Sequence, residues 1–172
     1  MKEELRNKYK IIRDNIKDKD IKSNIIKNKV INTIEYQNSK VIALYKNLDT
    51  EVYTNDLINY ALNDNKIVAL PKVVGNTLKF YKTDNKSFTK SKYNIYEPIE
   101  TDIVDNIDLF IVPGICFDKY KNRLGFGKGY YDRVLKSIKI GICFEEQIYD
   151  KKIDTDEYDI KMDKIITDKN IY

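Results

Sequence analysis

The sequence predicts a three-layer α/β/α fold, in which helices cover both faces of a mostly parallel sheet. Short, continuous apolar runs recur along the chain, as expected for strands that are buried on both faces. Amphipathic segments separate several of these runs, and strands that alternate with helices favour a parallel sheet. We expect residues 1–172 to form a single domain, because a domain usually has about 100–200 residues.

Two helices are predicted before the first strand. Residues 2–18 carry apolar side chains three and four positions apart, which places them on one helical face: Leu5, Tyr9, Ile12 and Ile16. Ser23 is a suitable N-cap residue for a second helix that ends near Glu35. The apolar face of this second helix contains Ile26, Val30 and Ile34. Each helix therefore has one face for the core.

Strands and helices then alternate to the end of the chain. Residues 40–45 predict the first strand, and a helix over 54–63 follows with Thr54 as its N-cap. Residues 66–70 predict a second buried strand, which we expect Pro71 to end. The later elements are strands at 78–81, 108–112, 140–144 and 164–167, an exposed loop between 82 and 92, and a helix at 130–137.

The absence of histidine excludes several kinds of active site. Without an imidazole the chain cannot form a Ser-His-Asp or Cys-His catalytic group, or a histidine-ligated zinc site. The two cysteines, Cys116 and Cys143, cannot build a structural zinc site or a disulfide framework. Both lie in apolar runs, so we expect buried free thiols in a cytoplasmic protein.

The charge and hydropathy of the chain argue against two classes of partner. A net charge of +4 is too small to indicate a general nucleic-acid-binding protein. No apolar stretch approaches the roughly 20 residues of a membrane span, and the charged start lacks the apolar segment of a signal peptide. We therefore expect neither a nucleic acid nor a membrane as partner.

The segment after the predicted strand at 108–112 has the composition of a phosphate-binding loop. Ligands of parallel α/β folds bind beyond the carboxyl ends of the strands, where this segment begins. Gly125, Gly127 and Gly129 allow the backbone to approach a ligand closely and to direct N–H groups toward it. Residues 118–133 contain five basic and two acidic residues, and the next helix adds its positive N-terminal end. A polyphosphate site needs these features.

Arginine is scarce in this lysine-rich chain, so each arginine is informative about recognition of an anion. The four are Arg6, Arg13, Arg123 and Arg133. The loop matches neither common phosphate motif, because Lys128 precedes a glycine rather than the Ser or Thr of a P-loop, and the glycine spacing differs from that of dinucleotide-binding loops. A flexible surface loop that closes a strand–helix turn is the alternative interpretation.

Two stretches of the chain resemble the signature of a known enzyme family. The stretch 123–132 reads RLGFGKGYYD and the stretch 112–118 reads VPGICFD. Together they resemble the signature of the 5-formyltetrahydrofolate cyclo-ligases, also called 5,10-methenyltetrahydrofolate synthetases. Further matches in family order and spacing are Lys2 and Arg6, Tyr45, Glu51 to Thr54, Leu70 to Val73, Ile95 to Pro98, Asp159 and Asp163. The resemblance therefore covers nearly the whole chain.

The resemblance implies a ring closure that is driven by ATP and requires Mg²⁺. In this family the formyl oxygen of 5-formyltetrahydrofolate attacks the γ-phosphate of ATP, and N10 then displaces phosphate to leave 5,10-methenyltetrahydrofolate and ADP. Such a transfer needs positioning and charge neutralisation more than a protein nucleophile, which a chain without histidine can supply. The resemblance also implies a fold like that of NagB, RpiA and the CoA transferases, small-molecule partners (ATP and 5-formyltetrahydrofolate) and a monomer.

The resemblance also assigns roles to residues of this chain. Catalysis would involve Arg123, Lys128 and Tyr131. ATP would be bound by Lys2, Arg6, Arg123, Leu124, Gly125, Phe126, Gly127, Lys128, Gly129, Tyr130 and Tyr131. The folate would be bound by Glu51, Phe126 and Tyr130, since a carboxylate can accept hydrogen bonds from pterin N–H groups. Asp132 and Asp159 would bind Mg²⁺, because hard carboxylate oxygens suit this ion.

Other interpretations of these residues and of the chain stay open. Lys2 and Arg6 could belong to a solvated basic helix face, and Asp132 could cap or salt-bridge the helix after the loop. Asp163 is expected to be structural, and Lys72 stands where the family often has arginine. One alternative function is that of a phosphosugar isomerase or CoA transferase, from the similar fold. Another is a basic RNA-binding module, against which the acidic C-terminal region argues.

Overall fold

A six-stranded sheet forms the centre of the computed structural model, which describes residues 1–91 and 96–172. The strand order is β11-β9-β6-β1-β2-β3. The strands from β11 to β2 run parallel, and β3 is antiparallel to β2. Their bounds are β1 Val41–Ala43, β2 Ile67–Val74, β3 Thr77–Lys82, β6 Leu109–Val112, β9 Ile138–Ile142 and β11 Lys164–Ile166. The mostly parallel sheet predicted from the sequence is thus confirmed.

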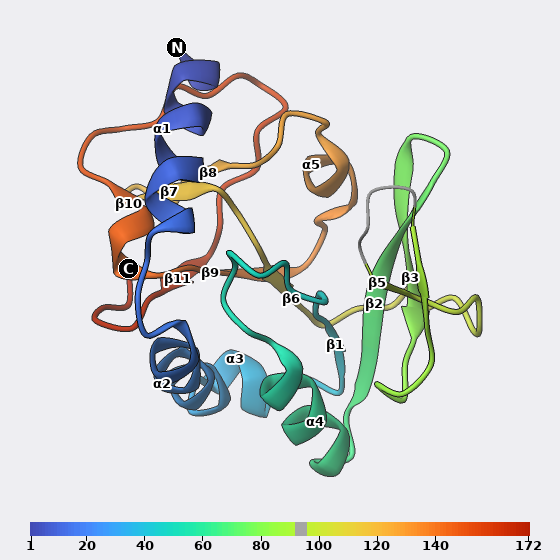
Figure 1. The fold of residues 1–172 in the computed structure, drawn as a ribbon. Coiled ribbons are helices and arrows are strands. Elements are labelled where there is room, and N and C mark those ends of the chain that lie inside the picture. The colour runs from blue at the N-terminus through green and yellow to red at the C-terminus, as the bar shows by residue number, and fades with distance from the viewer. Residues whose placement is uncertain (92–95) are drawn as a thin grey trace.

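Helices lie on both sides of this sheet, with α2, α3 and α4 on one side and α5 on the other (Figure 1). The helices are α1 Lys2–Asp14, α2 Lys19–Ile31, α3 Ile34–Gln37, α4 Asn55–Asn63 and α5 Tyr130–Val134, with a 3₁₀ turn η1 at Glu145–Gln147. α2 and α4 bury Ile26, Val30 and Ile58 against one face. α5 packs beside β3 on the opposite face.

The two faces of the strands explain why the apolar runs are continuous. In β1, Ile42 belongs to the core under α2 and α4, whereas Ala43 belongs to the core on the α5 side. β6 alternates in the same way, with Ile111 in the first core and Phe110 in the second. Because these strands contribute to two cores, neighbouring positions are both apolar, as expected for a covered parallel sheet.

A smaller sheet supports the N-terminal helix. It has the order β10-β7-β8, with bounds β7 Cys116–Asp118, β8 Arg123–Leu124 and β10 Ile148–Tyr149. Tyr9 of α1 packs onto this sheet, and its ring meets that of Tyr149 edge-on, with 6.1 Å between the centroids. β7 and β8 precede the glycine loop, so this packing brings α1 close to the loop (Figure 1).

The predicted N-cap of the second helix is wrong. Ser23 lies inside α2, which begins at Lys19 after Asp18 in a left-handed conformation. The Ser23 hydroxyl is buried and accepts a hydrogen bond from the backbone N–H of Tyr53. Ser23 therefore fastens α2 to the segment before α4. The helix predicted over 23–35 is divided into α2 and α3 at Asn32 and Thr33.

The prediction that Pro71 ends the second strand is also wrong. β2 continues to Val74, and Pro71 pairs with Phe80 in the ladder with β3. β1 pairs with β2 only as far as Ala69, so β2 has a neighbour on one side alone at Pro71. A missing N–H is tolerated at such an edge position.

The loop expected between residues 82 and 92 contains a further strand. β4 (Phe88–Lys90) pairs with β5 (Tyr96–Pro98) in a two-stranded sheet. Of the family match at 95–98, Ile95 lies outside the described residues.

Both cysteines are buried free thiols, as predicted. No helix of the described residues is long and apolar enough to cross a bilayer.

Candidate active site

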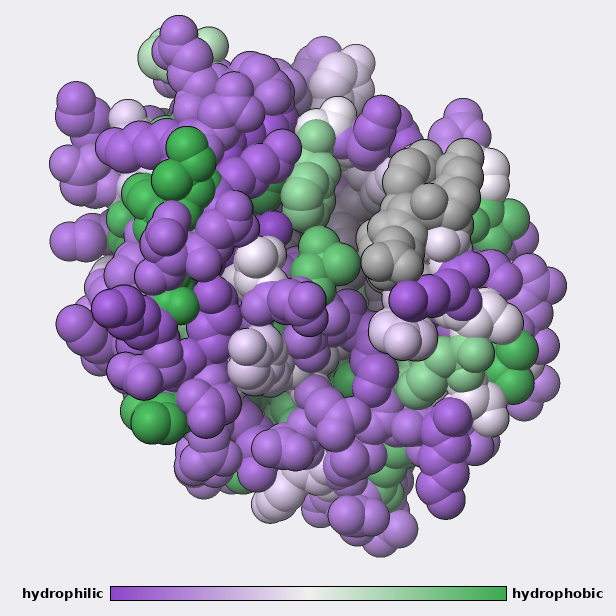
Figure 2. All heavy atoms as spheres, viewed as in Figure 1, coloured by the Kyte–Doolittle hydropathy of each residue, from purple (hydrophilic) through white to green (hydrophobic). Residues whose placement is uncertain are grey.

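A cavity of about 440 Å³ opens beyond the carboxyl ends of β1 and β6. Its walls come from the segments that follow these strands, from β2 and β3, from the glycine loop and from α5. Tyr45 and Glu51 line it after β1, and Pro113 and Gly114 line it after β6. Figure 2 shows the molecular surface hollowed in this region, between the side of α1 and the side of β2 and β3. The location agrees with the position of ligands in parallel α/β folds.

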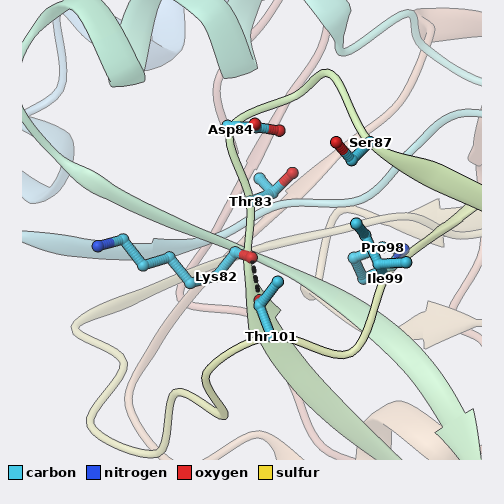
Figure 3. Close-up of a pocket in the computed structure, with 7 residues that line it drawn as sticks. All are labelled: Lys82, Thr83, Asp84, Ser87, Pro98, Ile99 and Thr101. Atoms are coloured by element: carbon cyan, nitrogen blue, oxygen red, sulfur yellow. Dashed lines mark hydrogen bonds between the residues drawn. The ribbon is translucent and has the colours of Figure 1, made fainter.

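Two other hollows of the described surface do not combine charged and aromatic side chains as this cavity does. One of about 220 Å³ lies between β3 and the segment after β5, and the Lys82 ammonium points away from the side chains around it (Figure 3). There Thr101 donates a hydrogen bond to the backbone oxygen of Lys82. The other hollow, of about 650 Å³, lies at the opposite end of the sheet beside Asp108 and Asp163. Their carboxylates accept backbone N–H groups at strand starts, so both are structural there.

The glycine loop meets α1 through close contacts of its backbone. Arg6 donates from Nε to the Gly125 oxygen at 2.8 Å. A Cβ atom on Gly127 would lie 3.2 Å from the Arg6 guanidinium carbon, and the φ angle of Gly127 is +93°. Gly129 (φ +68°) occupies the N-cap position of α5. Glycine is therefore required here both by backbone conformation and by the approach of α1.

Arg123 is held at the inner side of the loop. Its Nε donates to the Pro113 oxygen at 2.6 Å, and its guanidinium carbon lies 4.9 Å from the centroid of the Tyr131 ring. Burial lowers the pKa of Arg123, against the opposing effect of Tyr131, Asp132, Glu51 and Asp159. Burial also raises the pKa of the Tyr131 hydroxyl. A fixed, partly desolvated guanidinium of this kind is suited to binding an anion strongly.

The two aspartates with a predicted metal role lie on neighbouring segments of the chain. Asp159 Oδ2 accepts from Lys2 Nζ at 2.6 Å, and Asp132 Oδ1 accepts from the backbone N–H of Ile160 at 3.2 Å. Burial opposes the charge of Lys2, but the hydrogen bond and charge of Asp159 outweigh it and raise the Lys2 pKa. Lys2 is also 3.5 Å from Asp156. Asp159 is thus paired with Lys2, and Asp132 is bonded to the residue that follows Asp159.

The two aspartates, Asp132 and Asp159, fit an ion that takes few protein ligands. Within the described part of the chain, no group of three or more His, Cys, Asp or Glu side chains could hold a metal ion. Mg²⁺ commonly binds one or two carboxylates and completes its coordination with water and substrate phosphates. Asp132 and Asp159 are compatible with that pattern, because the contacts above engage one oxygen of each carboxylate.

Glu51 is one of two buried acids that line the cavity, and the other is Glu97 of β5. Glu51 is 6% exposed, and its Oε1 accepts from the backbone N–H of Leu48 at 2.7 Å. Its Oε2 lies 4.0 Å from Nη1 of Arg13. Burial raises the pKa of Glu51, whereas the Leu48 hydrogen bond and the charges of Arg13 and Arg123 lower it. Glu51 therefore presents a buried carboxylate to the cavity, next to Arg13.

The remaining predicted residues differ in how they face the cavity. Phe126, Lys128, Gly129, Tyr130 and Tyr131 line it, and Phe126 and Lys128 lie exposed at its rim. Leu124 does not line it, because this side chain is 2% exposed and packs in the core under α1. Lys72 forms an ion pair with Glu100 at 3.3 Å.

Sequence reasoning did not assign a role to Arg13 or to Lys46. Lys46 lines the cavity, and its Nζ donates to the side-chain oxygens of Asn55 and Asn85. Arg13 is 4% exposed and lies beside Glu51. The signal for Arg13 was the scarcity of arginine, whereas Lys46 is one of many lysines and had no distinguishing signal.

Comparisons with known proteins agree with the resemblance seen in the sequence. The model of the 5-formyltetrahydrofolate cyclo-ligase family matches residues 1–168. A probable 5-formyltetrahydrofolate cyclo-ligase of Schizosaccharomyces pombe is 34% identical over 167 residues, which cover 83% of this chain and 81% of that protein. The 5-formyltetrahydrofolate cyclo-ligase of Mus musculus is 32% identical, with 83% and 80% of the two chains covered.

Solved structures with the same architecture have the second name of this family, 5,10-methenyltetrahydrofolate synthetase. The 5,10-methenyltetrahydrofolate synthetase of Aquifex aeolicus superposes with a TM-score of 0.87 at 33% identity, covering 99% of this chain and 91% of that one. The enzyme of that name from Mycoplasma pneumoniae gives a TM-score of 0.79 at 27% identity, covering 97% and 98%.

Proposed function

Because the chain belongs to the 5-formyltetrahydrofolate cyclo-ligase family, we propose that it converts 5-formyltetrahydrofolate to 5,10-methenyltetrahydrofolate with hydrolysis of ATP to ADP and phosphate. The observation that carries this proposal is one cavity that combines two kinds of chemical group. Arg123, Lys128 and Gly129 line it with positive charge and loop backbone, and Glu51 lines it with a buried carboxylate. A triphosphate and a pterin require these two kinds of group.

The first step is the transfer of the γ-phosphoryl group to the formyl oxygen. The oxygen forms a bond to phosphorus while the bond to ADP breaks, which changes a poor leaving group into a good one. In our proposal Arg123 and Lys128 neutralise the charge that develops on the phosphoryl oxygens. The loop backbone at Gly125, Gly127 and Gly129 binds the phosphates, and Lys2 and Arg6 extend the positive surface from α1.

The second step closes the ring. N10 attacks the activated formyl carbon and loses its proton to the solvent, and the carbon–oxygen bond breaks to release phosphate together with the former formyl oxygen. In our proposal Glu51 accepts hydrogen bonds from the pterin and fixes its orientation, while Phe126 and Tyr130 flank the folate. Tyr131, stacked beneath Arg123, takes part by holding the guanidinium in place. The chain thus contributes mainly position and charge.

Mg²⁺ is expected to accompany ATP at this site. When bound, it would neutralise the negative charge of the phosphates. Asp132 and Asp159 would hold it, and Lys2 would then exchange its contact with Asp159 for one with a phosphate. We also propose that residues 1–172 form a single domain with the fold of the phosphosugar isomerases. We propose that the protein is monomeric and cytoplasmic.

The direct test is to mix the protein with Mg-ATP and 5-formyltetrahydrofolate and to follow the near-ultraviolet absorbance of the methenyl product. We expect product to form only when ATP is present. Folded protein that gives no ATP-dependent signal would exclude this function. Turnover of a sugar phosphate without ATP would instead favour the isomerase alternative.

A further inference from the structure

Arg13 lies at the end of α1, and its charged side chain is buried, unlike that of Lys8 on the same helix. The Arg13 side chain is 5% exposed. Charged side chains are almost never fully buried unless they have a partner. The position of Arg13 therefore needs a specific explanation.

The contacts of Arg13 reach three segments that surround the cavity. Its Nη1 donates to the Gly114 oxygen after β6 at 3.5 Å and lies 4.0 Å from Glu51 Oε2 after β1. Its guanidinium carbon is 5.5 Å from the centroid of the Phe126 ring in the glycine loop. One guanidinium thus links α1 to the segment after β1, to the segment after β6 and to the glycine loop.

These contacts leave the guanidinium incompletely satisfied. The hydrogen bond to Gly114 is long, and Nε is buried without a hydrogen-bond partner among residues 1–91 and 96–172. An arginine placed for stability alone is expected to use its five donors in short bonds. Here the main feature is instead a positive charge next to the carboxylate of Glu51.

Burial raises the pKa of Glu51, and the charge of Arg13 acts against burial in favour of the ionised carboxylate. Its other oxygen is held by Leu48, and the groups that face it are Arg13, Arg123, Tyr45 and Tyr131. The two tyrosines are neutral, and Arg123 is directed to Pro113 by its Nε. Arg13 is therefore the cation that forms the ion pair with Glu51.

We propose that Arg13 is a positioning residue that keeps the Glu51 carboxylate charged and oriented toward the folate. This inference rests on the proposed function, because it assigns the affected subsite to the folate. Without Arg13, a buried carboxylate with fewer nearby positive charges takes up a proton more readily. A protonated Glu51 is a poorer acceptor for pterin N–H groups, so folate binding weakens and ATP binding does not.

The test compares Arg13→Gln and Arg13→Lys with the unchanged protein in steady-state kinetics. For Arg13→Gln we expect KM for 5-formyltetrahydrofolate to rise roughly tenfold, as for loss of one charge-assisted contact, with KM for ATP changed by less than about twofold. The acid limb of kcat/KM for the folate should move to higher pH. Arg13→Lys should restore part of both effects, because it keeps the charge and loses the geometry.

Two further variants separate positioning from simple loss of stability. Val30→Ala removes buried volume in α2, away from the cavity, and should lower thermal stability without moving the acid limb. The double variant Arg13→Gln with Glu51→Gln contains no buried unpaired carboxylate and remains testable if Arg13→Gln does not fold. We expect its KM for the folate to equal that of Glu51→Gln alone, since the two residues act through one interaction.

The inference is overturned if Arg13→Gln raises both KM values equally, or leaves the acid limb in place. Additive effects in the double variant would overturn it as well. These outcomes are distinct from failure of the proposed function, in which the unchanged protein itself shows no ATP-dependent product.

Discussion

Lys128 lies exposed on the rim of the cavity and forms no ion pair with any side chain of the described residues. It is therefore available to a phosphate without breaking a contact within the protein. We predict that Lys128→Ala raises KM for ATP roughly tenfold to a hundredfold, the loss expected for one charge-assisted contact. Lys136→Ala, an exposed lysine just after α5, is the control and should leave KM unchanged. An unchanged KM for ATP in Lys128→Ala would remove this residue from the site.

Gly127 is constrained by its backbone and by its neighbour at once. Its φ angle is +93°, and an added Cβ would lie 3.2 Å from the Arg6 guanidinium carbon. We predict that Gly127→Ala lowers the free energy of unfolding by about 1–2 kcal/mol and also raises KM for ATP, since Arg6 must move. Urea denaturation and steady-state kinetics measure the two effects.

Gly75 supplies the matched control for this prediction. It has a φ angle of +63° in the turn between β2 and β3, and an added Cβ would have no atom within 4 Å. Gly75→Ala should therefore lose stability to backbone strain and keep its KM for ATP. Equal changes in KM for the two variants would contradict a specific role of the close approach at Gly127.

At the scale of elements, the C-terminal segment is held against η1 by hydrogen bonds to one carboxylate. Glu145 accepts hydrogen bonds from Thr167, Asn170 and Tyr172. Burial alone would raise its pKa, but these hydrogen bonds outweigh burial and lower it. A carboxylate with a lowered pKa in the folded state stabilises the fold above the ordinary carboxyl pKa of about 4.3. That stabilisation is lost as the pH falls through the lowered value.

We therefore predict that Glu145→Gln is less stable than the unchanged protein at neutral pH and loses less stability on acidification. Urea denaturation between neutral pH and about pH 3 measures the difference. Glu146→Gln is the control, because this neighbouring acid is exposed and pairs with Lys22 at the surface. Parallel pH profiles for Glu145→Gln and the unchanged protein would contradict the role of the carboxylate.

Strands and helices were predictable where local pattern decides them, and were missed where tertiary contacts decide them. The run at 108–112 could be assigned from its residues because its neighbours in the sequence are enough to define a covered strand. Pro71 could not, because its tolerance in β2 depends on where β1 ends. Ser23 has the residue type of an N-cap, but its hydroxyl is used by Tyr53, 30 positions away.

At the scale of the whole molecule, the candidate site joins segments that are distant in the sequence. The glycine loop was evident from its composition, and the resemblance to the family added Lys2, Arg6, Glu51 and the two aspartates. The packing of α1 on the small sheet explains how Lys2 comes to lie 2.6 Å from Asp159. Arg13 was not assigned, because its burial beside Glu51 depends on contacts over 38 and 101 positions that no local pattern records.

The small net charge of the molecule is the sum of regions with opposite charge. Arg6 of α1 contacts the glycine loop at Gly125, while the acidic C-terminal region supplies Asp159, which pairs with Lys2. The proposed reaction needs no histidine, because in it ATP provides the leaving group and the protein provides charge and position.

The fate of the formyl oxygen tests the central claim most directly. The protein is supplied with Mg-ATP and 5-formyltetrahydrofolate labelled with ¹⁸O in the formyl group, and the released phosphate is examined by mass spectrometry. We predict that each methenyl product is accompanied by one phosphate that carries the label. Unlabelled phosphate released together with methenyl product, or methenyl product formed without ATP, would contradict phosphorylation of the formyl oxygen.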